Sequence, residues 1–200
     1  MKLGDQEKFW KGKFGDNYIN RNQISNRHLV IGKDLVDNRI EIKSAVELGP
    51  NIGLNLDGLK RIFPSLDTFG VEINKKAFSI LKKKHKCVNK SIVNYKSKKK
   101  FDLVLITGVL MHQNPKNLIK IYKTMYSLTK KYIYISEYFN PKPVEIPYHN
   151  EKKRLFKRDF AKEIWQLYPT LKLINYGFQW KQDPFFSGGC DDTNWFLFSK

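Results

Sequence analysis

Short runs of consecutive apolar residues alternate along the chain with longer segments in which the apolar residues are spaced as on one face of a helix. The short runs, such as residues 103–106 and 132–135, are typical of strands buried on both faces of a sheet. The longer segments, such as residues 54–63, predict amphipathic helices. The predicted strands are 44–48, 68–73, 86–89, 101–106, 131–137, 171–179 and 193–199, and the predicted helices are 24–38, 53–63, 75–84, 115–128 and 157–167.

This order of elements predicts the fold class. Strands that alternate with helices imply βαβ units, and therefore a mostly parallel sheet covered by helices on both faces. The last two strands are joined without a helix, which predicts an antiparallel final pair. We therefore expect a three-layer, Rossmann-like α/β fold with a mostly parallel seven-stranded sheet and an antiparallel last strand. Since no internal repeat or flexible linker divides the 200 residues, we expect a single domain.

The formal net charge of +18 raises the question of nucleic-acid binding. Only six of the 37 cationic residues are Arg, the residue favoured for bidentate contacts with phosphate and guanine. The lysines are scattered or form runs such as residues 96–100, which suit a solvated loop. The composition therefore indicates a basic surface and argues against nucleic acid as the partner.

Other features of the composition predict a cytoplasmic enzyme. No segment approaches the roughly 20 apolar residues of a membrane span, and the first eight residues lack the apolar part of a signal peptide. The two cysteines, Cys87 and Cys190, form no CxxC pair and support neither a disulfide scaffold nor a zinc site. We thus expect no bound metal and no membrane partner.

The most informative motif is Glu47-x-Gly49-x-Asn51-x-Gly53, which follows the first predicted strand. Glycine, and to a lesser degree Asn, allows the left-handed backbone of a tight turn and lets a ligand approach the main chain beside a helix N-terminus. The spacing differs from the G-x-G-x-x-G of dinucleotide folds. A carboxylate at Glu47 suits the positively charged amino-acid end of S-adenosylmethionine. A structural turn with a buried acid is the alternative.

The ends of the next strands predict the remaining contacts with this cofactor. Glu72 ends the second strand, where a carboxylate can accept both ribose hydroxyls, and Ile73 can pack on the adenine. Contacts with the adenine edge would come from Asn89, Ser91 or Ile92. Thr107 and Gly108, after the fourth strand, are further candidate cofactor contacts, and Gly108 allows close approach to the backbone. We therefore expect S-adenosylmethionine as the cofactor in preference to NAD.

Polar residues beyond residue 107 are candidates for catalysis and substrate binding. His112 lies at the same predicted sheet edge and is the first candidate for a general base, although it can equally be a structural loop histidine. Glu137 and His149 are the next candidates for the base. Residues 140–143 (Asn-Pro-Lys-Pro) predict an extended, turn-rich loop over the pocket. The predicted substrate ligands are Tyr138, Asn140, Tyr148 and Arg158.

Several segments carry a resemblance over nearly the whole chain. They are Phe9-Trp10, Phe14-Gly15-Asp16-x-Tyr18-x-x-Arg21-Asn22, Phe101-Asp102-Leu103-Val104, Gly108-Val109-Leu110-Met111-His112-Gln113-Asn114-Pro115, Tyr132 to Pro141, Pro143 to His149, Leu155 to Phe160 and Asp191-Asp192-Thr193-Asn194-Trp195-Phe196. In this order they resemble the pseudaminic acid biosynthesis-associated methylases, which are predicted S-adenosylmethionine-dependent enzymes. The sequence departs from the family pattern at two places. His149 stands where a basic residue, usually Arg, is expected, and residues 187–190 alter the turn before Asp191.

The resemblance implies a class I methyltransferase fold and a substrate that is a small anionic sugar derivative of nonulosonic (pseudaminic) acid or surface-glycan biosynthesis. Residues 1–40 would form an N-terminal lid and helix, residues 41–140 the cofactor-binding core, and residues 141–200 the substrate loop, a helix and the final strand pair. The N-terminal arm is too irregular for a core helix, and Arg21 within it is the candidate ligand of the methionine carboxylate.

Two other functions remain open. An RNA methyltransferase is supported by the net charge alone, and salt-sensitive retention on nucleic acid would identify it. A non-catalytic adapter that keeps the fold would bind the cofactor without turnover. The intact set of Glu47, Gly49, Gly53 and Glu72 argues against the adapter.

Overall fold

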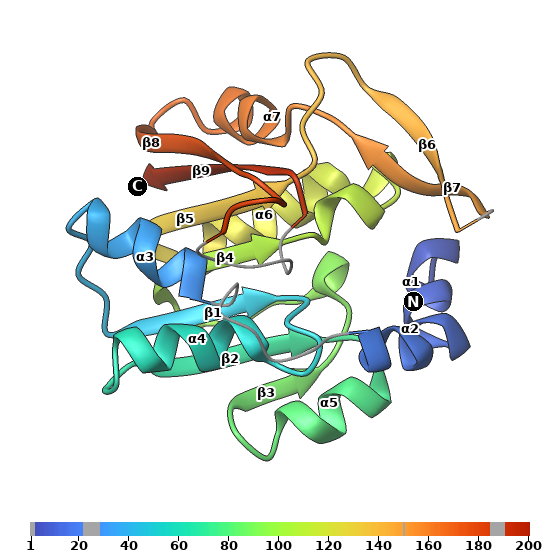
Figure 1. Ribbon diagram of the computed structural model, residues 1–200, viewed down its shortest axis with the longest axis horizontal. Helices are drawn as coiled ribbons and strands as arrows, with labels where there is room; N and C mark the ends of the chain where they lie inside the picture. Colours follow the sequence, from blue (N-terminus) through green and yellow to red (C-terminus); the bar gives the residue numbers. More distant parts are fainter. Residues whose placement is uncertain (1–2, 22–28, 150, 185–190) are drawn as a thin grey trace.

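A seven-stranded sheet forms the centre of the protein (Figure 1). The computed structural model describes residues 3–21, 29–149, 151–184 and 191–200. Within this sheet the strand order is β3-β2-β1-β4-β5-β9-β8. The strands are β1 (Ser44–Leu48), β2 (Asp67–Glu72), β3 (Lys86–Asn89), β4 (Phe101–Thr107), β5 (Thr129–Glu137), β8 (Lys172–Gln179) and β9 (Thr193–Ser199). The pairs from β3 to β5 are parallel, whereas β9 runs antiparallel to both β5 and β8, which confirms the predicted fold.

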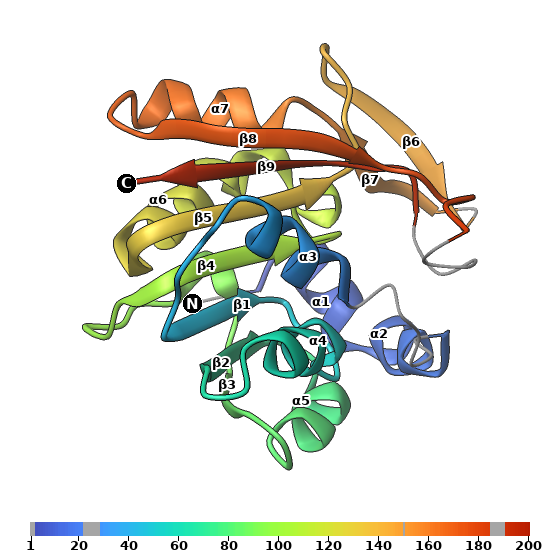
Figure 2. The same ribbon diagram turned by 60° about the vertical axis from the view of Figure 1, so that its left-hand side comes forward.

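Helices cover both faces of this sheet, as Figure 2 shows. They are α1 (Asp5–Lys11), α2 (Lys13–Tyr18), α3 (Val30–Asp37), α4 (Leu54–Ile62), α5 (Lys75–Leu81), α6 (Leu118–Leu128) and α7 (Phe160–Leu167), with short 3₁₀ turns η1 (Ile19–Arg21), η3 (Ile92–Asn94), η4 (Leu110–His112) and η5 (Pro115–Asn117). None of the helices in the described part of the chain combines the length and the apolar character needed to cross a bilayer.

The apolar run of β4 explains the three layers. Val104 and Ile106 pack with α6 and α7 in one core cluster, whereas Leu103 and Leu105 pack with α3 and α4 in the other. Because side chains alternate between the faces of a strand, a central strand between two helical layers is buried at every position. All six residues from Phe101 to Ile106 are buried accordingly, and the polar one, Asp102, accepts from the amide of Lys43.

The segment before α7 differs from the expected loop. Two strands of this segment, β6 (Val144–Tyr148) and β7 (Glu151–Lys157), form a separate antiparallel pair. The helix predicted from residue 157 begins only at Phe160, because Lys157 still pairs with Val144 and because the Asp159 side chain caps the helix by accepting from the Lys162 amide.

The N-terminal arm is more ordered than the sequence predicts. It folds into the two short helices α1 and α2, which lie at the carboxyl-terminal edge of the sheet (Figure 1). Gln6 of α1 donates to the carbonyl of Lys153 in β7, and the carbonyl of Trp10 accepts from Asn74 beyond β2. The helix predicted over 24–38 is described only from Val30 onwards, because residues 22–28 lie outside the described part.

Candidate functional site

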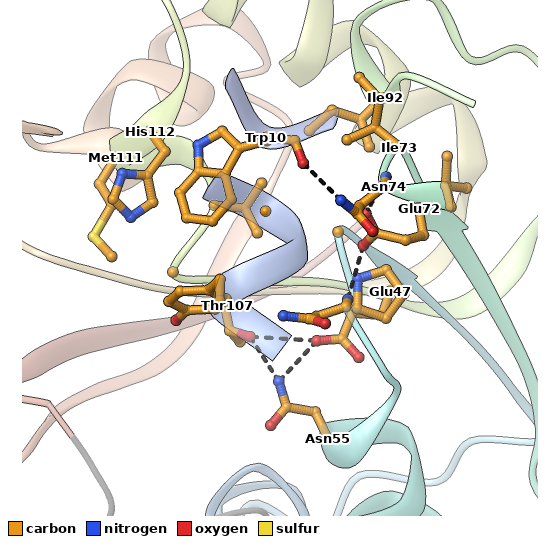
Figure 3. A pocket seen from close by; sticks show the side chains of 18 of the residues that line it. Trp10, Glu47, Asn55, Glu72, Ile73, Asn74, Ile92, Thr107, Met111 and His112 are labelled. Atoms are coloured by element: carbon orange, nitrogen blue, oxygen red, sulfur yellow. Dashed lines mark hydrogen bonds between the residues drawn. The ribbon is translucent and has the colours of Figure 1, made fainter. Parts of the chain in front are cut away.

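A cavity of about 270 Å³ opens at the carboxyl ends of the parallel strands (Figure 3). Ligands of open α/β sheets bind at this edge, where the strand order reverses. Its walls come from the turn after β1, the end of β2, residues 91–92, residues 107–113 and the helices α1 and α2. Thr193 of β9 and Gln179 of β8 contribute from the other half of the sheet.

The turn after β1 has the backbone that its glycines predict. Gly49 has φ +82°, Asn51 φ +52° and Gly53 φ +89°, so all three lie in the left-handed region. Gly49 and Asn51 line the cavity, but Gly53 is not among the lining residues. Gly53 caps α4 instead, and a Cβ atom there would lie 2.6 Å from Leu81 Cδ1.

Glu47 is a buried acid with one oxygen left without a partner. Its Oε1 accepts from Asn55 Nδ2 at 2.7 Å and from Thr107 Oγ1 at 3.4 Å (Figure 3). Its Oε2 is buried and has no hydrogen-bond partner within the described structure. Burial raises the pKa of Glu47 to about 7, and the two hydrogen bonds oppose this rise. Since Glu47 lines the cavity, a cationic group of a ligand would complete it.

Glu72 is buried beside Glu47 at the end of the neighbouring strand. Its Oε2 accepts from the amide of Asn51 at 2.8 Å, and its Oε1 accepts from the amide of Asn74 at 2.6 Å. Burial raises the pKa of Glu72 to about 7 despite these bonds. Each oxygen keeps a second lone pair, so the fixed carboxylate can still accept from two hydroxyls of a ligand.

Most of the other predicted cofactor residues also line the cavity. Ile73, Ser91 and Ile92 line the cavity as the sequence predicts, and so do Thr107 and Gly108. Asn89 does not line it; its Nδ2 donates to the backbone carbonyls of Glu72 and Ile73 and ties β3 to β2. No group of three or more His, Cys, Asp or Glu in the described chain is arranged to hold a metal ion.

His112 is a neutral histidine at the opposite side of the cavity. Its Nδ1 lies 2.8 Å from the carbonyl oxygen of Arg154, which can only accept, so Nδ1 carries the proton. Nε2 is then an acceptor, and burial lowers the pKa of His112 to about 4. The ring packs between Trp10 and Tyr148, with centroid distances of 4.8 Å to each.

The fold of the chain recurs in solved structures. No protein-family model matches this sequence, and no curated protein sequence matches it. Magnesium protoporphyrin IX methyltransferase from Synechocystis PCC 6803 with bound SAH (S-adenosylhomocysteine) aligns at 12% identity and a TM-score of 0.71, covering 98% of this chain and 100% of that chain. An S-adenosylmethionine-dependent methyltransferase from Clostridium acetobutylicum ATCC 824 aligns at 12% identity and a TM-score of 0.64, covering 92% and 95%. The chain has the class I methyltransferase fold.

A third solved structure shows how varied the substrates of this fold are. The 1,6-didemethyltoxoflavin-N1-methyltransferase of Burkholderia thailandensis aligns at 11% identity and a TM-score of 0.67, covering 93% of this chain and 82% of that chain. At these identities the matches establish the methyltransferase fold. The resemblance to pseudaminic acid-associated methylases stays a prediction, since no comparison tests it.

The Glu137 carboxylate accepts hydrogen bonds from backbone amides and does not line the cavity. Its Oε1 accepts from the amides of Val109 and Leu110 at 2.9 and 2.7 Å, and its Oε2 accepts from the amide of Met111 at 3.2 Å. The carboxylate thereby fixes the turn that leads to His112. The structure thus places Glu137 as a support of the cavity wall, and its predicted role as a base has no geometric support.

Five further predicted ligands and the third predicted base also lie outside the cavity lining. They are Arg21, Tyr138, Asn140, Tyr148, Arg158 and His149. Arg21 donates to Nε2 of His149 at 3.0 Å, and Arg158 donates to Glu163 at 2.7 Å. Each arginine therefore already has a partner among the described residues and reaches no ligand in this arrangement.

Many of the residues that line the cavity were not predicted from the sequence. Among them are Gln6, Glu7, Trp10 and Asn55. Asn55 could have been found, because it is the second residue of the helix that begins after Gly53 and so faces the ligand side of the turn. The three residues of α1 carry no local signal, since a seven-residue helix is too short to show a periodicity.

Proposed function

We propose that the protein is an S-adenosylmethionine-dependent methyltransferase. The observation that carries this proposal is the pair of buried carboxylates, Glu47 and Glu72, at the ends of neighbouring parallel strands in one cavity. Glu47 Oε2 is buried without a partner among the described residues and fits the α-ammonium group of the cofactor. Glu72 is held by two backbone amides and fits the two ribose hydroxyls.

The residues around this pair would complete the cofactor site. Ile73 and Ile92 would pack on the adenine, while Gly49 and Gly108 would leave room for the methionine part beside the backbone. Bound S-adenosylmethionine supplies an electrophilic methyl group on a good leaving group. The protein therefore has to orient the acceptor and exclude water, which the α1 and α2 helices do by closing one side of the cavity.

His112 would hold a proton during the reaction. It is neutral at pH 7, and its Nε2 accepts, because Nδ1 is engaged by the carbonyl of Arg154. No side chain in the described part of the chain hydrogen-bonds Nε2, so the atom is free to accept from a substrate in the cavity it lines.

For the substrate we propose a small sugar derivative of nonulosonic acid or surface-glycan biosynthesis, which rests on the sequence resemblance alone. The anionic character expected from the sequence has less support, because Arg158 and Arg21 are engaged outside the cavity.

Calorimetric titration tests the proposed function. We expect S-adenosylmethionine and SAH to bind with micromolar dissociation constants, and NAD to bind at least about 100-fold more weakly because the turn lacks a dinucleotide's pyrophosphate site. Binding of NAD in place of SAH, or binding of neither, would contradict the proposal. SAH binding without turnover on any acceptor would support the adapter alternative.

The affinity for SAH should depend on pH below neutrality. The ammonium group of the ligand binds the ionised form of Glu47, whose pKa is about 7, so protonation of Glu47 competes with binding as the pH falls. Glu72, the other titratable group beside it, has the same pKa of about 7 and acts in the same direction. We expect at least about tenfold weaker binding at pH 6 than at pH 8.

Calorimetry of the Glu47→Gln variant provides the control for this pH dependence. The variant should bind SAH weakly at every pH, and its Kd should change less with pH because one of the two titrating groups is gone. A pH dependence of the Kd equal to that of the unmutated protein would show that Glu47 does not bind the ammonium group of the ligand.

A further inference from the structure

Two side chains that line the cavity each donate a hydrogen bond to a backbone carbonyl of β7. Gln6 donates from Nε2 to the carbonyl of Lys153 at 3.1 Å, and His112 donates from Nδ1 to the carbonyl of Arg154 at 2.8 Å. These bonds to neighbouring carbonyls of β7 fix the orientation of both side chains. They leave Gln6 Oε1 and His112 Nε2 as the free acceptors of two residues that line the cavity.

Glu7, next to Gln6 on α1, adds a third acceptor. Its Oε2 accepts from the amide of Gly4 at 2.8 Å, while its Oε1 is buried without a partner in the described structure. Gln6 Oε1 is unpartnered in the same way. Both residues are more than nine-tenths buried, with exposed fractions of 6% for Gln6 and 7% for Glu7. Buried acceptors are costly unless a ligand supplies donors, so this end is built to receive N–H or O–H groups.

These acceptors belong to one end of the cavity. Trp10 lies one helical turn after Gln6, and its ring packs on the ring of His112 at 4.8 Å. Gln6 and His112 are also anchored to consecutive residues of β7. The α1 helix therefore sets Gln6 and Glu7 against the turn that carries His112.

The charges of the lining residues also favour a hydrogen-bond donor that carries positive charge. Although the chain has 37 Lys and Arg residues, none of them is among the described residues that line the cavity. The charged residues that do line it are acids: Glu7, Glu47, Glu72 and Asp191. Arg154, the cation nearest to His112 along β7, stacks over the ring of Phe9 at 4.5 Å and is not a lining residue. A carboxylate of the substrate would find no counter-charge among the described residues that line the cavity.

We propose that Gln6, Glu7 and His112 form the subsite for a primary amino group of the substrate and that its nitrogen is the methyl acceptor. An ammonium group offers three N–H donors to the three acceptors, whereas a hydroxyl group offers one and leaves two of them unmatched. The ammonium passes one proton to His112 Nε2. The nitrogen lone pair then forms the new N–C bond as the C–S bond of the sulfonium breaks, and that electron pair stays on sulfur.

A matched set of probes tests this inference, which rests on the proposed function. Small sugars and small acyclic compounds would be compared as primary amine, alcohol and carboxylate on the same scaffold. Calorimetry would measure their binding to the SAH-saturated protein, and SAH formation would measure turnover with S-adenosylmethionine. We expect at least one amine to bind at least about tenfold more tightly than its alcohol and carboxylate analogues, and only amines to be methylated.

The Glu7→Gln variant tests the subsite itself. It keeps the shape of the side chain and an oxygen for the Gly4 amide, but removes the charge, so the KM for the amine should rise at least about tenfold. The Kd for SAH should change less than about twofold, because the hydrogen bond that Glu7 makes in the described structure is to Gly4 and not to a proposed cofactor residue. Asp5→Asn, an equal change of charge at an exposed position on the same helix, should alter neither value.

The possible results separate the two proposals. Preferred binding of alcohols or carboxylates, or no binding of any probe to a protein that binds SAH, overturns the amino subsite and leaves the proposed function intact. Unchanged amine binding in Glu7→Gln also overturns it. Failure of SAH to bind overturns the proposed function, and the subsite inference falls with it.

Discussion

Replacing Glu72 by alanine should weaken the binding of SAH by at least about 100-fold, measured by calorimetry. The carboxylate would accept from both ribose hydroxyls, and hydrogen bonds to a charged group contribute about 1.5–3 kcal/mol each. Two such bonds correspond to about 3–6 kcal/mol, which is more than two orders of magnitude in Kd. The loss also removes the acceptor of the amides of Asn51 and Asn74, two residues that line the cavity.

The Asp67→Ala variant is the matched control for this prediction. Asp67 starts the strand that Glu72 ends, and it is a half-buried acid paired with Lys86 and Lys99. Its replacement removes the same charge from β2 but should leave the Kd for SAH within about twofold. Thermal unfolding of both variants would show that they fold. A folded Glu72→Ala protein with unchanged affinity would remove the main support for the cofactor site.

The central fold could be predicted because burial on both faces marks it in the sequence. The apolar runs of β4 and β5 have no polar alternation, and only a central parallel strand needs such a run. The β6–β7 pair could not be predicted in this way. In β6 the apolar residues Val144, Ile146 and Tyr148 do alternate, but over only five positions that include a proline. The β7 strand begins with four consecutive charged residues, so neither segment gives a strand signal of useful length.

The cofactor side of the site was predicted from local geometry, whereas the substrate side depends on long-range contacts. Gly49 and Asn51 lie in a turn whose backbone the sequence dictates. Gln6 is positioned by Lys153, which is 147 residues away in the chain, and no local pattern reports that contact. Glu137 was assigned to catalysis because it ends a strand at the correct edge, but three backbone amides occupy its carboxylate. The position of an acid at a strand end thus does not say whether it serves a ligand or the backbone.

A substitution in the turn after β1 should lower the stability of the cofactor-free protein strongly. Gly49 has φ +82°, and a Cβ atom there would lie 2.8 Å from Val109 Cγ2 and 3.2 Å from Val109 Cγ1. Gly49→Ala therefore combines the cost of a left-handed alanine, about 1 kcal/mol, with overpacking of about 1–3 kcal/mol. We expect the free energy of unfolding to fall by about 3 kcal/mol, seen as a drop of roughly 6–12 °C in Tm.

Gly108→Ala separates the two causes of this loss. Gly108 lies in the facing loop of the same cavity with φ +62°, but a Cβ atom there would meet only Met111 Cε, at 3.6 Å, an ordinary contact. This variant should carry the backbone cost alone, about 1 kcal/mol or a fall of roughly 2–4 °C in Tm. Equal losses in the two variants would mean that Val109 moves aside at no cost. Since Val109 begins the turn that Glu137 holds through three amides, that side chain is not free to move, and the larger loss is expected at Gly49.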